Sequence, residues 1–248
     1  MRNYFVTDLD RTIIHSKNPT FKCVEKMGDR EITYMTDKSY SLLQELLPKV
    51  EFIPCTMRNL KQTLRVDFIR KYSPKYIICT NGAQIYIDNK LDETWDNYMR
   101  SLLKENEVNN IISKIEKLNL NALEIRNIEG FYVALKFNTI EDATNSLERL
   151  RGVVGTEYVV LQSRVKVFLI NEKIDKANAL NYLKEKYNFE HIHTAGDSIY
   201  DMKFTGLDYV YSYLPKHAEF NHPKAYISEK DGIEATDSIL QAILDNLK

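Results

Sequence analysis

The segment VTDLDRTII, residues 6–14, places two aspartates one residue apart at the end of an apolar run. Asp8 and Asp10 follow Phe5 and Val6, which predict a buried strand. Two carboxylates this close repel each other, so the strand end needs a compensating positive charge. In open parallel sheets, ligands bind beyond the carboxyl ends of the strands. The segment therefore predicts a functional site at the end of the first strand of such a sheet.

Predicted strands and helices alternate near both ends of the chain. Before the middle of the chain they cover residues 3–10, 36–49, 50–55, 58–72 and 75–80. After residue 170 they cover residues 175–187, 190–198, 208–214, 224–228 and 232–247. This alternation predicts an α/β fold, with a Rossmann-like parallel sheet and helices on both of its faces.

The middle of the chain, residues 84–170, has a different pattern. It predicts hairpins and helices: a turn at Asp88-Asn89, a long helix around 99–118, strands turning near Glu129-Gly130, a helix over 140–151 and further strand over 157–171. We therefore expect residues 1–83 and 171–248 to form one catalytic core. Residues 84–170 are expected to form an inserted α+β cap domain that sets substrate specificity.

The composition excludes several classes of partner. The chain has 248 residues, 44% of them hydrophobic, and a formal net charge of -1, which gives no reason to expect binding to nucleic acid or membranes. The N-terminus lacks an apolar signal core and no run is long enough to span a membrane, so we expect a cytoplasmic protein. Cys23, Cys55 and Cys79 are expected to be buried, reduced thiols. The sequence does not indicate the oligomeric state.

Polar residues that suit phosphate chemistry follow the predicted strands. They are Asp8, Asp10 and Thr12 after the first, Thr56 and Arg58 after the second, Thr80 and Asn81 after the third, and Asp197 and Asp201 after a later one. Lys176 lies in the first turn of the helix at 175–187. Several carboxylates in one place require a cation, and Mg²⁺ prefers oxygen ligands. One carboxylate could then be a nucleophile and another a general acid/base, while Thr56 and Lys176 bind phosphoryl oxygens.

At these residues the chain resembles the haloacid dehalogenase superfamily of phosphohydrolases. The matching motifs are DLDRT, FIPCT, Lys176 and GDSIYD, and ICTNGAQIY is similar to the start of the α/β cap in the Cof-type subfamily. The resemblance implies a Mg²⁺-dependent phosphomonoester hydrolase that forms an aspartyl-phosphate. The full acidic set, together with a cap large enough to close over a small molecule, indicates a sugar phosphate or a similar small phosphorylated metabolite as the substrate.

The resemblance assigns roles to individual residues. Asp8 is the nucleophile, and Asp10 protonates the leaving oxygen and then activates water. Thr56 and Lys176 bind the phosphoryl oxygens. Mg²⁺ is held by Asp8, the backbone carbonyl of Asp10 and Asp197, with Asp201 supporting it directly or through water.

Other residues carry weaker expectations. Arg58 and Asn81 are candidates for substrate binding, although Asn81 could simply form a turn with Gly82. Four residues of the predicted cap strands could set specificity or simply face solvent: Arg126, Tyr132, Arg164 and Lys166. His191 and His193 are expected to have structural roles. The roles of Arg11, where relatives often carry glycine, and of residues 15–34, where the family places its flap, stay open.

Two alternatives remain open. A phosphomutase of the phosphomannomutase type would also carry both aspartates, and its cap would need a basic cluster such as Arg126, Arg164 and Lys166 for a second phosphate. A non-catalytic regulatory protein could keep the fold. In that case we would expect a degenerate site, whereas every charged catalytic position is present here.

Overall fold

The computed structural model describes residues 2–16 and 20–247, which form two compact units. The first contains residues 1–92 and 175–248, and the second contains residues 93–174. These limits differ from the expected 84–170 insertion. Residues 84–91 belong to the first unit because β6 (Gln84–Ile87) pairs antiparallel with β5 (Tyr76–Cys79) and with β7 (Lys90–Leu91). Asp88 and Asn89 form the predicted turn, both with positive φ.

The first unit is built on a parallel sheet, as the alternating pattern predicted. Its order is β14-β13-β12-β1-β4, and each neighbouring pair is parallel. The strands are β1 (Asn3–Thr7), β4 (Glu51–Pro54), β12 (His191–Ala195), β13 (Val210–Leu214) and β14 (Tyr226–Ile227). A parallel bridge between Cys55 and Ile78 places β5 beside the end of β4. Strand β1 is interior to the sheet, so the residues that follow it are flanked by the ends of β12 and β4.

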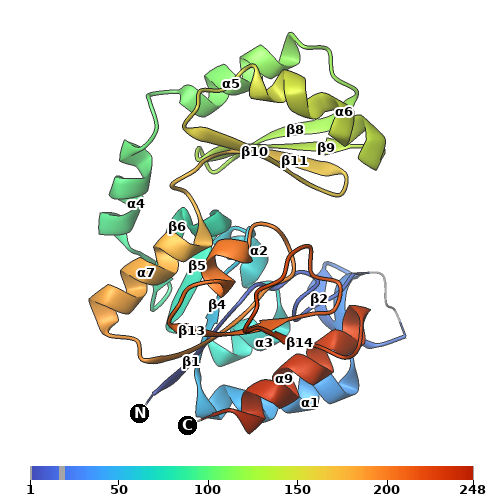
Figure 1. The fold of residues 1–248 in the computed structure, drawn as a ribbon, viewed down its shortest axis with the longest axis vertical. Coiled ribbons are helices and arrows are strands. Elements are labelled where there is room, and N and C mark those ends of the chain that lie inside the picture. The colour runs from blue at the N-terminus through green and yellow to red at the C-terminus, as the bar shows by residue number, and fades with distance from the viewer. Residues whose placement is uncertain (1, 17–19, 248) are drawn as a thin grey trace. The chain divides into compact units, whose positions relative to one another are not determined.

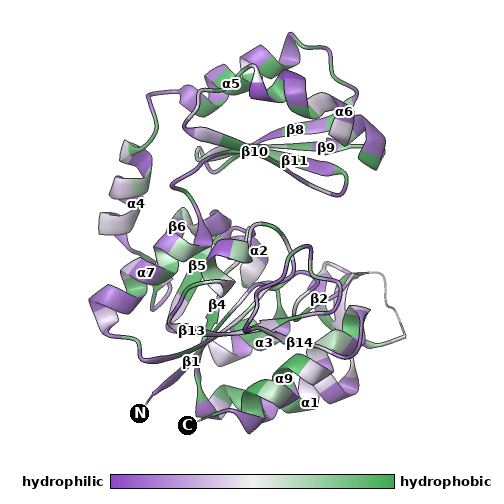
Figure 2. Ribbon diagram, viewed as in Figure 1, coloured by the Kyte–Doolittle hydropathy of each residue, from purple (hydrophilic) through white to green (hydrophobic). Residues whose placement is uncertain are grey.

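Helices cover both faces of this sheet (Figure 1). One face carries α1 (Asp37–Leu46), α3 (Asp67–Tyr72) and α9 (Ala235–Asp245), and their apolar side chains pack with Phe5 and Leu9. Figure 2 shows that α9 is largely apolar, in keeping with its buried Ile239, Leu240 and Ile243. The other face carries α7 (Lys176–Tyr187) and α8 (Met202–Thr205). Leu9 is buried among the α1 and α9 side chains while Asp8, its neighbour, belongs to the opposite side of the strand.

One prediction for the first unit needs correction, and one segment has a structure that was not predicted. The helix expected over 58–72 is two short helices, α2 (Leu60–Thr63) and α3, because Val66 has an extended backbone and bridges to Glu25. Residues 15–34, for which no strand was predicted, include most of a hairpin of β2 (Lys22–Met27) and β3 (Arg30–Met35). Residues 17–19 of this segment lie outside the described residues.

The second unit is a four-stranded antiparallel sheet with helices on one face. Its order is β10-β11-β9-β8. Its elements are α4 (Glu93–Ser101), α5 (Glu107–Glu116), β8 (Ala122–Ile128), β9 (Tyr132–Phe137), α6 (Ile140–Arg151), β10 (Tyr158–Ser163) and β11 (Lys166–Asn171). Apolar residues of α5 and α6 pack against Val133, Leu135 and Val167. The prediction of one long helix around 99–118 is wrong. The segment contains the end of α4, at Ser101, and a separate helix α5, and Asn106 between them has a left-handed backbone.

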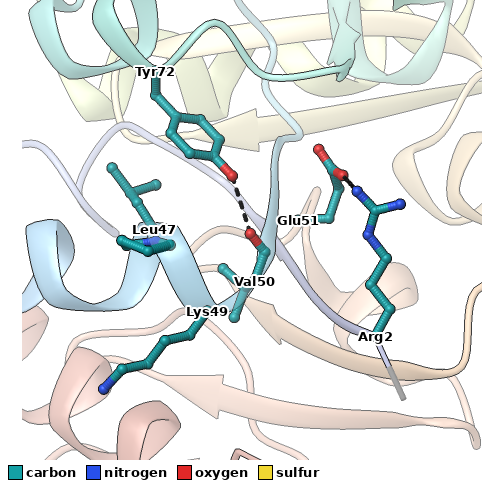
Figure 3. Close-up of a pocket in the computed structure, with 7 residues that line it drawn as sticks. Arg2, Leu47, Lys49, Val50, Glu51 and Tyr72 are labelled. Carbon is teal, nitrogen blue, oxygen red and sulfur yellow. Dashed lines mark hydrogen bonds and ion pairs between the residues drawn. The ribbon is translucent and has the colours of Figure 1, made fainter.

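A hollow of about 300 Å³ lies at the amino ends of the core strands (Figure 3). The Tyr72 hydroxyl donates to the Val50 carbonyl at 3.0 Å, and Arg2 forms an ion pair with Glu51. Thr56 lies beyond the opposite end of β4. Because ligands of parallel sheets bind at the carboxyl ends, we treat this hollow as structural.

Two further findings bear on the environment of the protein. Within residues 2–16 and 20–247, no helix combines the length and apolarity needed to cross a membrane. The three cysteines all lie in described segments and form no disulfide. Cys55 and Cys79 are fully buried, as expected, whereas Cys23 is only partly buried.

Candidate active site

The carboxyl ends of β1 and β12 bring three aspartates together. The sheet hydrogen bonds continue past β1, since the Asp8 amide donates to the Ala195 carbonyl at 2.9 Å. Asp197 follows β12 after Gly196, and Asp201 lies one turn further on. Carboxylate oxygens of Asp8, Asp197 and Asp201 lie within 4.8 Å of one another, and all three residues are buried. The structure thus brings together three of the acidic residues identified from the sequence.

Lys176 places a positive charge inside this acidic group. Its Nζ lies 2.7 Å from Asp8 Oδ1 and 2.6 Å from Asp201 Oδ1, and the side chain is 1% exposed. Asp175 caps α7 by accepting a hydrogen bond from the Asn178 amide at 2.8 Å, which fixes the start of the helix. Burial opposes the charge of Lys176, but Asp201 and Asp8 outweigh burial and raise its pKa. The lysine is therefore protonated over the physiological pH range.

Asp201 is held in place by the loop that contains Asp197. Its Oδ2 accepts hydrogen bonds from the amides of Asp197 and Ser198, at 3.0 and 2.9 Å, and from the Ser198 hydroxyl at 3.0 Å. A Cβ at Gly196 would lie 2.4 Å from the Asp201 Cβ, so only glycine fits there. Ser198 was not singled out from the sequence, because a serine after an aspartate is also ordinary turn composition.

The carboxylate charges in this group are only partly compensated. Burial raises the pKa of both Asp8 and Asp197 above the usual range for aspartate. The positive charge of Lys176 opposes the shift of Asp8, whereas the negative charge of Asp201 raises the pKa of both residues further. Asp197 Oδ2 is buried and accepts no hydrogen bond from the described residues, although Arg11 Nη1 lies 3.3 Å away. Clustered carboxylate oxygens with an unfilled acceptor suit a hard divalent cation, which prefers such ligands.

Neutral groups lie at the neighbouring strand ends. Thr56 follows β4 and is buried; its amide donates to the Ile78 carbonyl, and its Oγ1 accepts from the Arg58 amide at 3.2 Å. The Asn81 amide donates to the Thr56 carbonyl at 3.1 Å. Thr12 Oγ1 lies 3.5 Å from Asp8 Oδ2 and 3.4 Å from Asp197 Oδ1. The strand-end positions predicted from the sequence are therefore adjacent at one edge of the sheet.

The Asp10 side chain forms a two-point contact with Arg58. Arg58 Nε lies 2.7 Å from Asp10 Oδ2, and Nη2 lies 2.7 Å from Oδ1. The remaining nitrogen, Nη1, donates to Glu25 Oε2 at 2.9 Å. Burial opposes the charge of Arg58, but its hydrogen bonds to Asp10 raise the guanidinium pKa. Arg58 was a candidate for substrate binding; in the structure its three nitrogens donate to the carboxylates of Asp10 and Glu25. Glu25 was not identified from the sequence.

Arg11 also contacts the acidic group. Its φ of 67° is in the left-handed region, which favours glycine. Nη1 lies 3.3 Å from Asp197 Oδ2 and 3.7 Å from Glu219 Oε1. His193, in contrast, is buried in the sheet, where its Nδ1 lies 3.1 Å from the Tyr213 hydroxyl. Arg11 thus belongs to the site, whereas His193 has the structural role expected of it.

The candidate specificity residues of the second unit differ in their surroundings. Arg126 is half-exposed and pairs with Glu124 at 3.2 Å. Tyr132 is buried, with its ring centroid 6.3 Å from that of Phe168. Arg164 forms the turn between β10 and β11 with a φ of 54°, and Lys166 is exposed. The three basic residues therefore lie at exposed or turn positions, and Tyr132 belongs to the interior of this unit.

Comparison with known proteins identifies the family. The family model described as sucrose-6F-phosphate phosphohydrolase matches residues 1–212. The chain belongs to this family. It is therefore a phosphatase of the haloacid dehalogenase superfamily, as the four motifs predicted, and its parallel-sheet core is the fold expected of such a phosphohydrolase. Among curated protein sequences, none matches the chain significantly.

Solved structures agree with this phosphohydrolase fold. The sucrose-phosphatase of Synechocystis sp. PCC6803, in complex with sucrose and phosphate, has a TM-score of 0.70 at 16% identity, over 99% of this chain and 98% of that one. A HAD/COF-like hydrolase from Plasmodium vivax gives 0.68 at 14% identity, over 98% and 96% of the two chains. A trehalose-6-phosphate phosphatase of Aspergillus fumigatus gives 0.56 at 12% identity, over 99% and 93%. At these identities the likeness shows a shared fold.

Proposed function

We propose that this phosphatase hydrolyses the phosphate monoester of a sugar and that Asp8 is its nucleophile. The observation that carries the proposal is the contact of Asp8 with Lys176 at 2.7 Å, inside a buried group of aspartates at the carboxyl edge of the sheet. A carboxylate beside a fixed ammonium group can attack a phosphorus atom while the lysine compensates the charge of the phosphoryl oxygens. Membership of a phosphohydrolase family supports the same chemistry.

The protein side chains would act in two steps. An oxygen of Asp8 forms a bond to phosphorus while the bond to the sugar oxygen breaks, and Asp10 gives its proton to that oxygen. Asp10 then takes a proton from water as the water oxygen attacks phosphorus, which releases inorganic phosphate and restores Asp8. The Thr56 hydroxyl and Lys176 would bind phosphoryl oxygens. Arg58 and Asn81 remain candidates for contact with the substrate.

A magnesium ion fits the acidic group. Asp8, the Asp10 carbonyl and Asp197 would hold it. Asp201, whose oxygens already accept four hydrogen bonds, would support it indirectly. When bound, the ion supplies positive charge to the phosphoryl oxygens and removes the repulsion between carboxylates.

The substrate proposal follows from the family. Sucrose-6F-phosphate is the first candidate, because the matching family is named for its hydrolysis. We propose that residues 93–174 set the choice of sugar. The family match favours hydrolysis over the phosphomutase alternative, since the matched proteins are phosphohydrolases.

We also propose a cytoplasmic location, which the reduced cysteines support.

Replacing Asp8 with asparagine tests the mechanism. We expect Asp8→Asn to lower kcat by at least about 10³-fold, because the amide cannot form the aspartyl-phosphate. The measurement is inorganic phosphate release with Mg²⁺ from sucrose-6F-phosphate, trehalose-6-phosphate, hexose phosphates and p-nitrophenyl phosphate. A thermal unfolding curve of the variant is the check that it is folded.

Lys203→Gln serves as the matched control. Lys203 pairs with the helix cap Asp175 at 2.8 Å, and its own side chain is 57% exposed. Its turnover should stay within about threefold of the wild type, since Lys203 contacts Asp175 Oδ2, whereas Oδ1 is the oxygen that caps α7. Wild-type turnover in Asp8→Asn would overturn the nucleophile assignment. Isomerised sugar phosphate without phosphate release would instead establish the mutase.

A further inference from the structure

We infer that Glu25, on the β2–β3 hairpin, is a positioning residue for proton transfer: it holds Arg58, and Arg58 holds the carboxylate of Asp10. The inference rests on the proposed function, in which Asp10 moves the proton. The contacts form one chain of charge-assisted hydrogen bonds, from Glu25 Oε2 to Arg58 Nη1 at 2.9 Å and from Arg58 to both Asp10 oxygens at 2.7 Å. Each contact lies within the first unit.

The burial of Glu25 argues for a specific role. Its side chain has no exposed surface, although a buried carboxylate is costly unless it is fully paired. Oε1 accepts from Arg65 at 3.0 Å, and Oε2 accepts from Arg58 and from the Thr33 hydroxyl at 3.1 Å. Two arginines and two carboxylates, those of Glu25 and Asp10, therefore balance each other. Glu25 is the buried centre of this network.

The local backbone turns Glu25 toward Arg58. The pairing of β2 with β3 shifts register on both sides of Glu25, which is the pattern of a β-bulge. A bulge redirects a side chain, and here Val24 and Glu25 are both buried although they are adjacent in one strand. Glu25 also bridges to Val66, the residue at which the predicted helix breaks. The β2–β3 hairpin is thus fixed to the rest of the unit at Glu25, the residue that contacts Arg58.

The need for positioning follows from the exposure of Asp10. The Asp10 side chain is 53% exposed, whereas that of Arg58 is only 11% exposed. A half-exposed aspartate can adopt several side-chain rotamers, and a two-point contact with a planar guanidinium selects one. Arg58 can select one Asp10 rotamer only while the plane of its own guanidinium group is fixed. The hydrogen bond from its third nitrogen, Nη1, to Glu25 fixes that plane. General acid/base catalysis is sensitive to such placement of the group that gives and takes the proton.

The variant Glu25→Gln tests this inference. We expect kcat to fall about 10- to 100-fold with KM unchanged, because the substrate still binds while Asp10 is misplaced. The loss in kcat/KM should be larger for a sugar phosphate than for p-nitrophenyl phosphate, whose leaving group needs little protonation. If Glu25 had a merely structural role, Glu25→Gln would lower kcat/KM equally for both substrates. Arg58→Lys, which cannot form the two-point contact, should show the same larger loss for the sugar phosphate than for p-nitrophenyl phosphate.

The controls separate this inference from the proposed function. Lys26→Gln breaks the exposed pair with Glu31 on the same hairpin, at 3.2 Å, and should leave kcat within about twofold. Turnover that depends on Asp8 establishes the reaction first. If folded Glu25→Gln then keeps the wild-type kcat, or raises KM alone, the positioning role is overturned. If Glu25→Gln does not fold, as shown by thermal unfolding, the substrate dependence of Arg58→Lys decides.

Discussion

At the scale of single residues, Arg11 opposes the metal site that we propose. It occupies a backbone conformation with a φ of 67°, which costs a non-glycine residue about 1–2 kcal/mol. Its guanidinium lies 3.3 Å from the Asp197 oxygen that accepts no hydrogen bond from the described residues. A cation bound to Asp197 would meet this positive charge, so Arg11 should weaken binding of the metal.

We therefore expect Arg11→Gly to bind Mg²⁺ more tightly than the wild type, by about 3- to 10-fold. The size is modest because Arg11 is one-third exposed and solvent screens its charge. Isothermal titration calorimetry with Mg²⁺ measures the change. Lys38→Gln, an exposed position on α1, removes the same charge away from the site and should leave the affinity unchanged. Equal or weaker binding by Arg11→Gly would contradict the assignment.

The residues found from the sequence share one property. Asp8 and Asp197 follow strands, and Lys176 begins a helix, so a parallel sheet necessarily brings them to one edge. Glu25 has no such signal, because its role depends on a bulge and on partners 33 and 40 positions away in the chain. Sequence patterns report local periodicity, and contacts at this separation are set by the tertiary fold.

At the scale of elements, the turn at Thr80–Gly82 positions the helix that carries Lys176. Three successive residues have positive φ there, and that of Gly82 is 91°. A Cβ at Gly82 would lie 2.3 Å from the carbonyl oxygen of Asp175, the residue that caps α7. The Asn-Gly pair predicted a turn, but only the structure shows that the turn supports the start of α7.

We expect Gly82→Ala to destabilise the protein by at least about 2 kcal/mol and to lower kcat. The methyl group must displace the backbone beside Lys176, and alanine also disfavours positive φ. Gly28→Ala is the matched control, because Gly28 has a φ of 61° and a Cβ added there would have nothing within 4 Å. It should cost only about 1 kcal/mol. Urea unfolding compares the two, and a smaller loss at Gly82 would refute the packing argument.

Element boundaries were the weakest part of the sequence interpretation. The apolar spacing of Leu60, Leu64 and Phe68 predicts one helix, yet the bridge between Val66 and Glu25 divides it. Helical spacing continues across a break whenever both helices pack on the same core. The parallel pairing of the core strands was predictable, because parallel strands require long crossovers that are visible in the sequence.

At the scale of the whole molecule, the buried aspartates connect stability to pH and to metal. In the folded protein without metal, burial and neighbouring acids raise the pKa of Asp8 to about 7 and that of Asp197 to about 8, from 3.8. The folded state therefore binds more protons than the unfolded state across this range. It follows that stability is highest below the unfolded pKa and is lost as pH rises through the folded values.

We expect the free energy of unfolding in EDTA to fall between about pH 6.5 and 8, and added Mg²⁺ to stabilise the protein more at the upper end of this range than at the lower. The lower limit of pH 6.5 is chosen because of His15. Burial lowers the pKa of His15 from 6.5 to about 4, so its titration raises the free energy of unfolding as pH increases between these two values. Thermal unfolding at each pH, with EDTA or Mg²⁺, measures both effects. Asp197→Asn should flatten the pH dependence and remove most of the Mg²⁺ effect, because one acid and one ligand are lost together. A metal-free protein that gains stability over this range would show that the aspartates are charged at lower pH than their burial implies.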